Sequence, residues 1–161
     1  MIKKVSYTDD FDILAKLLND SFETVAKEFG LTKKNCPTNN AFITADDLKS
    51  QLDEKREFYY LCENDIPIGF IAVERSGREE GTFYIEKVAV HPDYRHNRSG
   101  IRLMDFATNL IRESGGKKIS IGIIDANIQL KNWYKRQGFT ELCTKTFDHL
   151  PFDVCYMEKF L

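Results

Sequence analysis

Residues 88–104 read VAVHPDYRHNRSGIRLM, and this stretch decides the fold. It opens with apolar residues typical of a buried strand, and Pro92 then stops the strand because proline has no backbone N–H for the ladder. A polar and basic run follows, and from Ser99 onward the apolar residues recur at helical spacing. The stretch therefore predicts a strand over residues 82–90, a basic loop, and an amphipathic helix over residues 99–113.

The start of this helix is suited to bind a pyrophosphate. The first turn of a helix has backbone N–H groups without partners, and the helix dipole adds positive potential there. Ser99 and Gly100 are small enough to let a ligand approach the backbone. Four nearby side chains carry or can carry positive charge: Arg95, His96, Arg98 and Arg102. The alternative is an ordinary helix start with exposed arginines.

A second stretch, residues 127–139, reads NIQLKNWYKRQGF and follows an isoleucine-rich strand predicted over residues 117–124. Such an apolar strand suits the inside of a sheet. The pattern predicts a last helix over residues 127–137, which Gly138 ends before Phe139 begins a new strand. A strand, a crossover helix and a second strand in this order predict a βαβ unit.

Together the two stretches resemble the cofactor core of the GCN5-related N-acetyltransferase (GNAT) superfamily. The superfamily pattern is Arg/Gln-x-x-Gly-x-Gly/Ala, and residues 95–100 match its first and last elements, whereas Arg98 stands where the first glycine usually lies. A non-glycine residue in the left-handed conformation costs about 1–2 kcal/mol. We therefore expect either a locally reshaped loop or an Arg98 side chain that pairs with a phosphate.

The resemblance implies that acetyl-CoA lies between the strand that ends at Val90 and the strand over residues 119–124, where the two splay apart. Backbone groups of Val88 and Val90 then pair with the pantetheine amide like an added strand. Asn127 matches a position that often contacts pantetheine, and a helix cap is the alternative. The cofactor-binding set that the resemblance implies is Val88, Ala89, Val90, Arg95, His96, Asn97, Arg98, Ser99, Gly100, Ile101, Asn127 and Tyr134.

The resemblance also implies two catalytic residues. Tyr134 matches the tyrosine that protonates the departing thiolate, because a phenol near its usual pKa of ~10 is protonated at neutral pH; a tyrosine that only packs on the sheet is the alternative. Glu86 is the candidate base for the acceptor amine, directly or through water, and strand alternation places it on the face of Val88 and Val90. Ordered water or a nearby histidine is the alternative base. Residues 22–42 are expected to line the acceptor pocket.

Composition argues against several other classes. The chain has 161 residues with 23 basic and 25 acidic side chains, so no global charge attracts nucleic acid. No apolar run of about 18 residues predicts a membrane span, and residues 1–4 do not begin a signal peptide, so we expect a cytoplasmic protein. The four cysteines have no CxxC spacing, which favours reduced thiols and predicts no metal site.

The remaining elements predict the rest of the sheet. A first strand over residues 2–7 precedes a helix capped by Asp9 or Asp10, and a short helix is predicted over residues 44–54. Strands over residues 57–63 and 66–75 are joined by the hairpin turn Asn64-Asp65, and two closing strands over residues 139–147 and 154–160 end the chain.

The predicted fold class is α/β: a single N-acetyltransferase domain over residues 1–161, with a GNAT-like mixed, mostly antiparallel twisted sheet, helices on both faces and a central βαβ unit that binds acyl-CoA. The expected function is acetyl-CoA-dependent transfer of an acetyl group directly to an amine of a small molecule or protein, by a monomer or homodimer without a metal. No cysteine has a Cys-His or helix-start setting that marks an acyl-enzyme nucleophile. A catalytically silent CoA-binding or regulatory module is the alternative.

Overall fold

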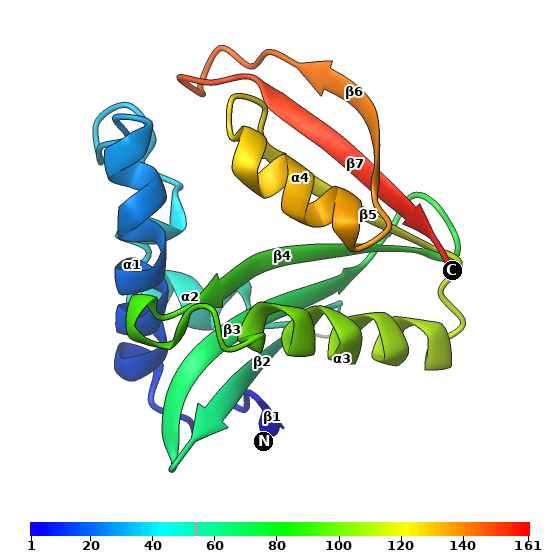
Figure 1. Cartoon of the computed structure of the whole chain (residues 1–161). Coiled ribbons are helices and arrows are strands. Elements are labelled where there is room, and N and C mark those ends of the chain that lie inside the picture. The colour runs from blue at the N-terminus through cyan, green and yellow to red at the C-terminus, as the bar shows by residue number, and fades with distance from the viewer. Residues whose placement is uncertain (54) are drawn as a thin grey trace.

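A computed structural model describes residues 1–53 and 55–161, and within them seven strands form one sheet in the order β1-β2-β3-β4-β5-β7-β6 (Figure 1). The strands are β1 (Ile2–Lys4), β2 (Arg56–Glu63), β3 (Ile66–Arg75), β4 (Thr82–Val90), β5 (Lys118–Ile124), β6 (Thr140–Lys145) and β7 (Val154–Phe160). The α-helices are α1 (Phe11–Glu28), α2 (Ala45–Gln51), α3 (Ser99–Glu113) and α4 (Ile128–Arg136), and the short 3-10 helices are η1 (Asn40–Phe42) and η2 (Pro92–Tyr94).

The predicted mixed, mostly antiparallel sheet is confirmed. Strands β4 and β5 run parallel, and the other neighbouring pairs of the described sheet run antiparallel. Helix α3 makes the crossover from β4 to β5, which is the predicted βαβ unit. Helices α1 and α2 pack on one face of the sheet, and α3 and α4 pack on the other (Figure 1).

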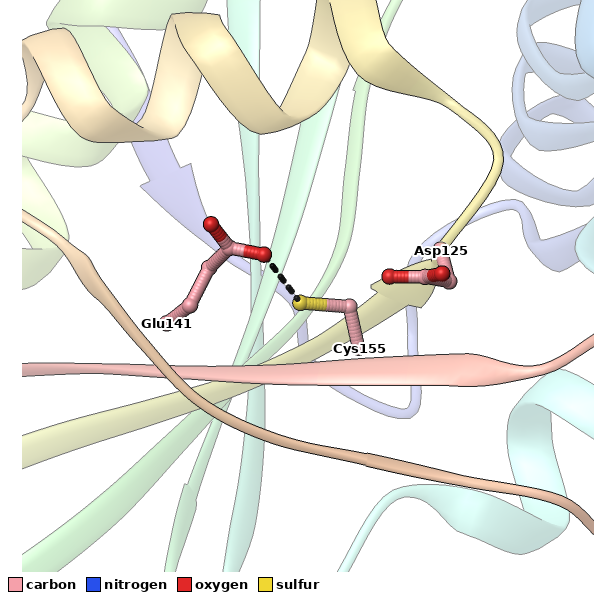
Figure 2. A group of neighbouring side chains, drawn as sticks. All are labelled: Asp125, Glu141 and Cys155. Atoms are coloured by element: carbon pink, nitrogen blue, oxygen red, sulfur yellow. Dashed lines mark hydrogen bonds between the residues drawn. The ribbon is translucent and has the colours of Figure 1, made fainter.

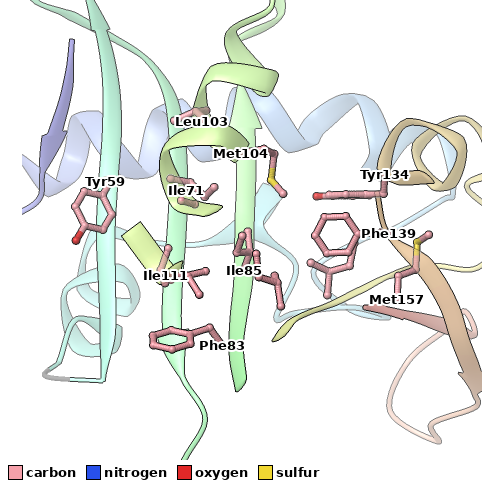
Figure 3. Packing of buried hydrophobic residues seen from close by; sticks show 14 of the residues in the cluster. Tyr59, Ile71, Phe83, Ile85, Leu103, Met104, Ile111, Tyr134, Phe139 and Met157 are labelled. Atoms are coloured by element: carbon pink, nitrogen blue, oxygen red, sulfur yellow. The ribbon is translucent and has the colours of Figure 1, made fainter. Parts of the chain in front are cut away.

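Alternating residues of the strands fill a core on each face. Phe58 and Phe70 pack under α1 and α2, whereas the next residues, Tyr59 and Ile71, pack under α3. Figure 3 shows this second core, which extends from α3 to α4 and includes Phe83, Ile85, Leu103, Met104, Ile111, Tyr134, Phe139 and Met157. The two cores hold the central strands rigidly from both sides.

Caps set the helix starts where the sequence predicts them. The Asp10 side chain accepts hydrogen bonds from the first turn of α1, and Thr44 and Asp47 form a capping box that begins α2. Helix α3 has the predicted bounds, whereas α2 ends at Gln51, and its predicted end at Glu54 lies outside the described residues. Among the described residues, no helix combines the length and the apolar character that crossing a bilayer requires.

The strand ends differ from the predictions by a few residues. Asn64 and Asp65 both have positive φ, 49° and 62°, as the predicted two-residue hairpin requires. Strand β1 ends at Lys4 instead of Tyr7, and β6 ends at Lys145. These shifts leave the strand order unchanged.

Strands β4 and β5 splay apart after a short parallel ladder. Their three paired positions are Thr82 with Lys118, Phe83 with Ile119, and Tyr84 with Ser120. Beyond Tyr84 the two strands diverge (Figure 1). The carboxyl-terminal half of β4 therefore presents backbone groups on the side that β5 has left.

A β-bulge interrupts the same half of β4. Phe70 of β3 lies opposite Ala89, but Ala72 lies opposite Glu86, so β4 contains one extra residue between these pairs. Lys87 lies in this segment and has a left-handed φ of 53°.

The bulge makes one prediction wrong, because an extra residue reverses the strand alternation beyond it. Glu86 lies opposite Ala72, whose side chain belongs to the core under α1 and α2, so Glu86 faces that side of the sheet. Val88 and Val90 pack against the core under α3. Glu86 therefore does not share the face of Val88 and Val90.

Candidate active site

The opening between β4 and β5 forms a cleft of about 1150 Å³. Its walls are β4, β5, the start of α3, the length of α4, the second half of α1 with the loop that follows, and residues at and before β7. Asn97 and Arg102, both expected near the phosphates, are not part of these walls. The other predicted site residues do line the cleft: Glu86, Val88, Ala89, Val90, Arg95, His96, Arg98, Ser99, Gly100, Ile101, Asn127 and Tyr134.

The start of α3 opens into this cleft without a side-chain cap. Its N-cap is Arg98, which adopts the left-handed conformation (φ 59°, ψ 15°) and makes no capping hydrogen bond. The loop is therefore not reshaped to avoid the strain expected at this position. The first-turn N–H groups are left for a ligand, as an anion site requires.

Arg95 holds the loop in place through hydrogen bonds to neutral groups. Its Nε donates to the carbonyl of Val90 at 3.2 Å, and its Nη2 donates to the carbonyl of Ser21 at 2.7 Å. Its Nη1 donates to the Thr24 hydroxyl at 3.2 Å. The guanidinium therefore joins the end of β4 to α1 and positions the loop before α3, while its charge stays at the cleft wall.

Gly100 is closely covered by α4. A Cβ atom placed on Gly100 would lie 3.2 Å from Cζ2 of Trp133 and 4.0 Å from Val90. A larger side chain here would have to displace the indole, so the close approach of α3, β4 and α4 depends on glycine.

Tyr134 lies at the floor of the cleft. It is only 5% exposed, and its ring packs edge-on against Trp133 and Phe139 with centroid distances of 4.9 and 5.5 Å. The hydroxyl points from α4 toward Met104 (Figure 3). Burial raises the pKa of the Tyr134 phenol above its usual value, so the group keeps its proton through neutral and mildly alkaline pH.

Asn127 caps α4, since its side chain accepts a hydrogen bond from the backbone N–H of Leu130 at 3.2 Å. The capping alternative is thus present in the structure. The side-chain amide lies in the cleft wall as well, and its contact with pantetheine stays a prediction.

Glu86 lines the cleft from the α1 side of the sheet. Its side chain is 38% exposed, and the nearest cation is the Arg56 guanidinium at 3.9 Å. Arg56 also pairs with Glu74 at 2.9 Å, which forms a row of three charges across β2, β3 and β4. The carboxylate is therefore held in position and still reachable from the cleft.

A further part of the cleft wall comes from α1 and the loop after it. Phe22, Val25 and Glu28 of α1 line it, together with the loop residues Thr38, Asn39 and Asn40. Of residues 22–42, these positions line the cleft, whereas Glu23, Phe29 and Phe42 lie outside its walls. That this segment contacts the acceptor stays a prediction. Residues at and before β7 also line the cleft: Leu150, Phe152, Val154 and Tyr156.

Lys87 and the residues before β7 were missed by sequence reasoning. Leu150 and Phe152 are apolar residues in an otherwise polar connection, and they pack with Ala26 and Ile124. Apolar residues in a polar loop indicate that the loop packs against another part of the molecule, but the sequence does not show which part.

Asp125, Glu141 and Cys155 form a cluster beside α4, outside the cleft walls, with ligand atoms within 4.8 Å of one another (Figure 2). An ammonium already bridges the two carboxylates: Lys131 donates to Asp125 at 2.8 Å and pairs with Glu141 at 3.0 Å. Lys135 and Lys131 together lower the pKa of Glu141 to about 2. The network ties α4 to β6, and a cation would have to displace Lys131 to bind there.

Known structures share the arrangement of this chain. The ribosomal-protein-S18-alanine N-acetyltransferase of Escherichia coli has a TM-score of 0.77 and 15% identity over 99% of this chain and 92% of its own. The PaiA N-acetyltransferase of Thermoplasma acidophilum, in complex with coenzyme A, has a TM-score of 0.74 and 18% identity over 100% and 98%. An aminoglycoside 6'-N-acetyltransferase complexed with coenzyme A has a TM-score of 0.71 and 14% identity over 99% and 96%. At these identities the likeness shows the fold alone.

A comparison with curated proteins found no match. The family model described as "Acetyltransferase (GNAT) family" matches residues 14–139, which include the basic loop, the start of α3 and all of α4. This match covers most of the sequence and all of the cleft-wall residues except those at and before β7. The chain belongs to the acetyltransferase (GNAT) family of enzymes.

Proposed function

We propose that residues 1–161 form a single N-acetyltransferase domain whose cleft binds acetyl-CoA and passes the acetyl group directly to an amine of a small molecule or protein. One observation carries this proposal: the uncapped start of α3 and Tyr134 line the same cleft, where β4 and β5 have separated. A phosphate-bearing thioester such as acetyl-CoA needs an anion site to bind its phosphates and a proton donor for the thiolate that leaves, and this cleft offers candidates for both.

In this proposal the pyrophosphate lies on the first-turn N–H groups of α3 and the pantetheine follows the free side of β4. The amine nitrogen attacks the thioester carbon, a C–N bond forms, and the C–S bond breaks. Tyr134 gives its proton to the departing thiolate, and Glu86 takes the proton of the amine directly or through water. None of the four cysteines lines the cleft, which supports transfer without an acyl-enzyme.

Calorimetric titration with CoA tests the binding half of the proposal, with dephospho-CoA and adenosine as controls. We expect Gly100→Val to weaken CoA binding at least about tenfold, because the side chain displaces Trp133 and blocks the loop. Gly77→Val is the matched control, since a Cβ there meets no atom closer than 3.8 Å. If Gly100→Val binds CoA with unchanged affinity, the start of α3 is not the phosphate-binding site.

A thiol-release assay with acetyl-CoA and a panel of amines tests the transfer half. Release that depends on an amine supports the enzyme. The second candidate is a catalytically silent CoA-binding module, which Arg98 in place of the usual glycine favours. CoA binding without release for any amine would select that candidate.

Arg98 yields a separate prediction. Arg98→Glu should weaken CoA binding about 10–100-fold, because a charge-assisted contact is replaced by repulsion. Arg98→Gly removes both the charge and the left-handed strain at φ 59°. Its affinity falls if the guanidinium pairs with a phosphate, and stays or rises if Arg98 only substitutes for glycine. Equal affinities of all three proteins, measured by calorimetry, discard both roles.

A further inference from the structure

Lys87 occupies an unusual place in the cleft. It lies in the bulged segment of β4 with a left-handed φ of 53°, and it lines the cleft. Its Nζ donates a hydrogen bond of 2.9 Å to Oδ1 of Asn40, at the start of η1. The bulge therefore turns an ammonium group toward the loop after α1, the segment expected to line the acceptor pocket.

This ammonium has a neutral partner but no carboxylate within ion-pair distance in residues 1–53 and 55–161. Glu86, its neighbour in β4, pairs with Arg56 instead. Glu28, the other acidic residue of the cleft wall, is exposed at the end of α1. Lys87 is half-buried, and its desolvation outweighs the attraction of the Glu86 charge, so the pKa of Lys87 is lowered and its charged form is costly to keep. An anion in the cleft would relieve that cost.

The partner of Lys87 is itself held in place. Asn19 of α1 donates from Nδ2 to the carbonyls of Asn40 and Ile43, both at 3.0 Å. Asn40 is thus fixed to α1 while its side-chain oxygen positions the ammonium. A cation oriented in advance loses little conformational entropy on binding a ligand.

We propose that Lys87 binds a carboxylate of the acceptor, so that the acceptor is an amine that also carries a carboxylate. This inference rests on the proposed function for the identity of the cleft, and Lys87 takes no part in bond making. A carboxylate forms a charge-assisted hydrogen bond with the ammonium, whereas a second amino group is repelled by it. Amino acids therefore fit the cleft better than polyamines do.

The test compares matched acceptors: amino acids, their primary amides, and diamines of similar length. Acceptor binding to the CoA-saturated protein is measured by calorimetry, and transfer is measured as kcat/KM. We expect the wild type to favour each amino acid over its amide about 10–100-fold in both measurements, and Lys87→Met to remove that preference. Lys87→Arg should keep part of it, and Lys117→Met, a change at an exposed lysine outside the cleft walls, should keep all of it.

The outcomes separate this proposal from the proposed function. If binding of the carboxylate depends on Lys87 but no acetyl transfer occurs, the result supports the role of Lys87 and overturns the proposed acetyltransferase function. If the wild type transfers acetyl groups equally well to amino acid and amide, the role of Lys87 is overturned and the proposed acetyltransferase function stands. A Lys87→Met protein that loses amino acid and amide binding equally, with a lowered Tm, shows that Lys87 only tethers β4 to η1 and also overturns the inference.

Discussion

Tyr134→Phe is expected to lower kcat about 10²–10⁴-fold while CoA affinity changes less than about twofold. The substitution removes only the hydroxyl, and the ring contacts with Trp133 and Phe139 remain. Thiolate departure then lacks its proton donor. Because burial raises the pKa of Tyr134, the wild-type rate should show no loss from Tyr134 ionisation up to about pH 10.

Steady-state rates from pH 6 to 10, together with CoA titration, check this expectation. Tyr59→Phe is the matched control, because Tyr59 is also buried under α3, outside the cleft walls, and its hydroxyl donates to Glu57 at 2.6 Å. That variant should lose stability and keep its turnover. Undiminished turnover in Tyr134→Phe would exclude the phenol from the mechanism.

Glu86→Gln is expected to lower kcat about 10²-fold or more near pH 7 and to recover part of the rate as the pH rises. The amide keeps the size of the side chain but cannot take the proton of the attacking amine. At higher pH a growing share of the free amine has lost its proton already, so the need for a base falls. The kcat of the wild type should rise less with pH than the kcat of Glu86→Gln does.

The control for Glu86 is Glu74, the other carboxylate that pairs with Arg56. Glu74→Gln removes the 2.9 Å pair with Arg56, and Glu74 is not part of the cleft walls. Its pH–rate profile should match the wild type. If the Glu86→Gln profile matches the wild type as well, water is the base.

The parts of the molecule that the sequence predicted are encoded locally. The hairpin at Asn64 and Asp65, the bounds of α3 and the glycine that ends α4 each depend on a few neighbouring residues. Tyr134 and Gly100 were located by the resemblance, and both line one cleft because α3 and α4 pack on the same face of the sheet.

The parts that sequence reasoning missed depend on distant contacts. The predicted sheet face of Glu86 was wrong because a β-bulge shifts the alternation of side chains in β4. The extra residue shows only in the pairing of β4 with β3. Arg95 was expected among the phosphates, but its guanidinium is bonded to Ser21 and Thr24, more than 70 residues earlier. The contact of Lys87 with Asn40 spans 47 positions in the same way.

Transfer of a labelled acetyl group tests the central claim most directly. The protein is mixed with acetyl-CoA labelled in the acetyl group and with an amine acceptor, and intact masses of protein and acceptor are followed alongside thiol release. The account predicts that the label appears on the amine in equal amount to the thiol, while the mass of the protein stays unchanged. Label retained on the protein as an intermediate, or CoA binding with no labelled amine from any acceptor, would contradict it.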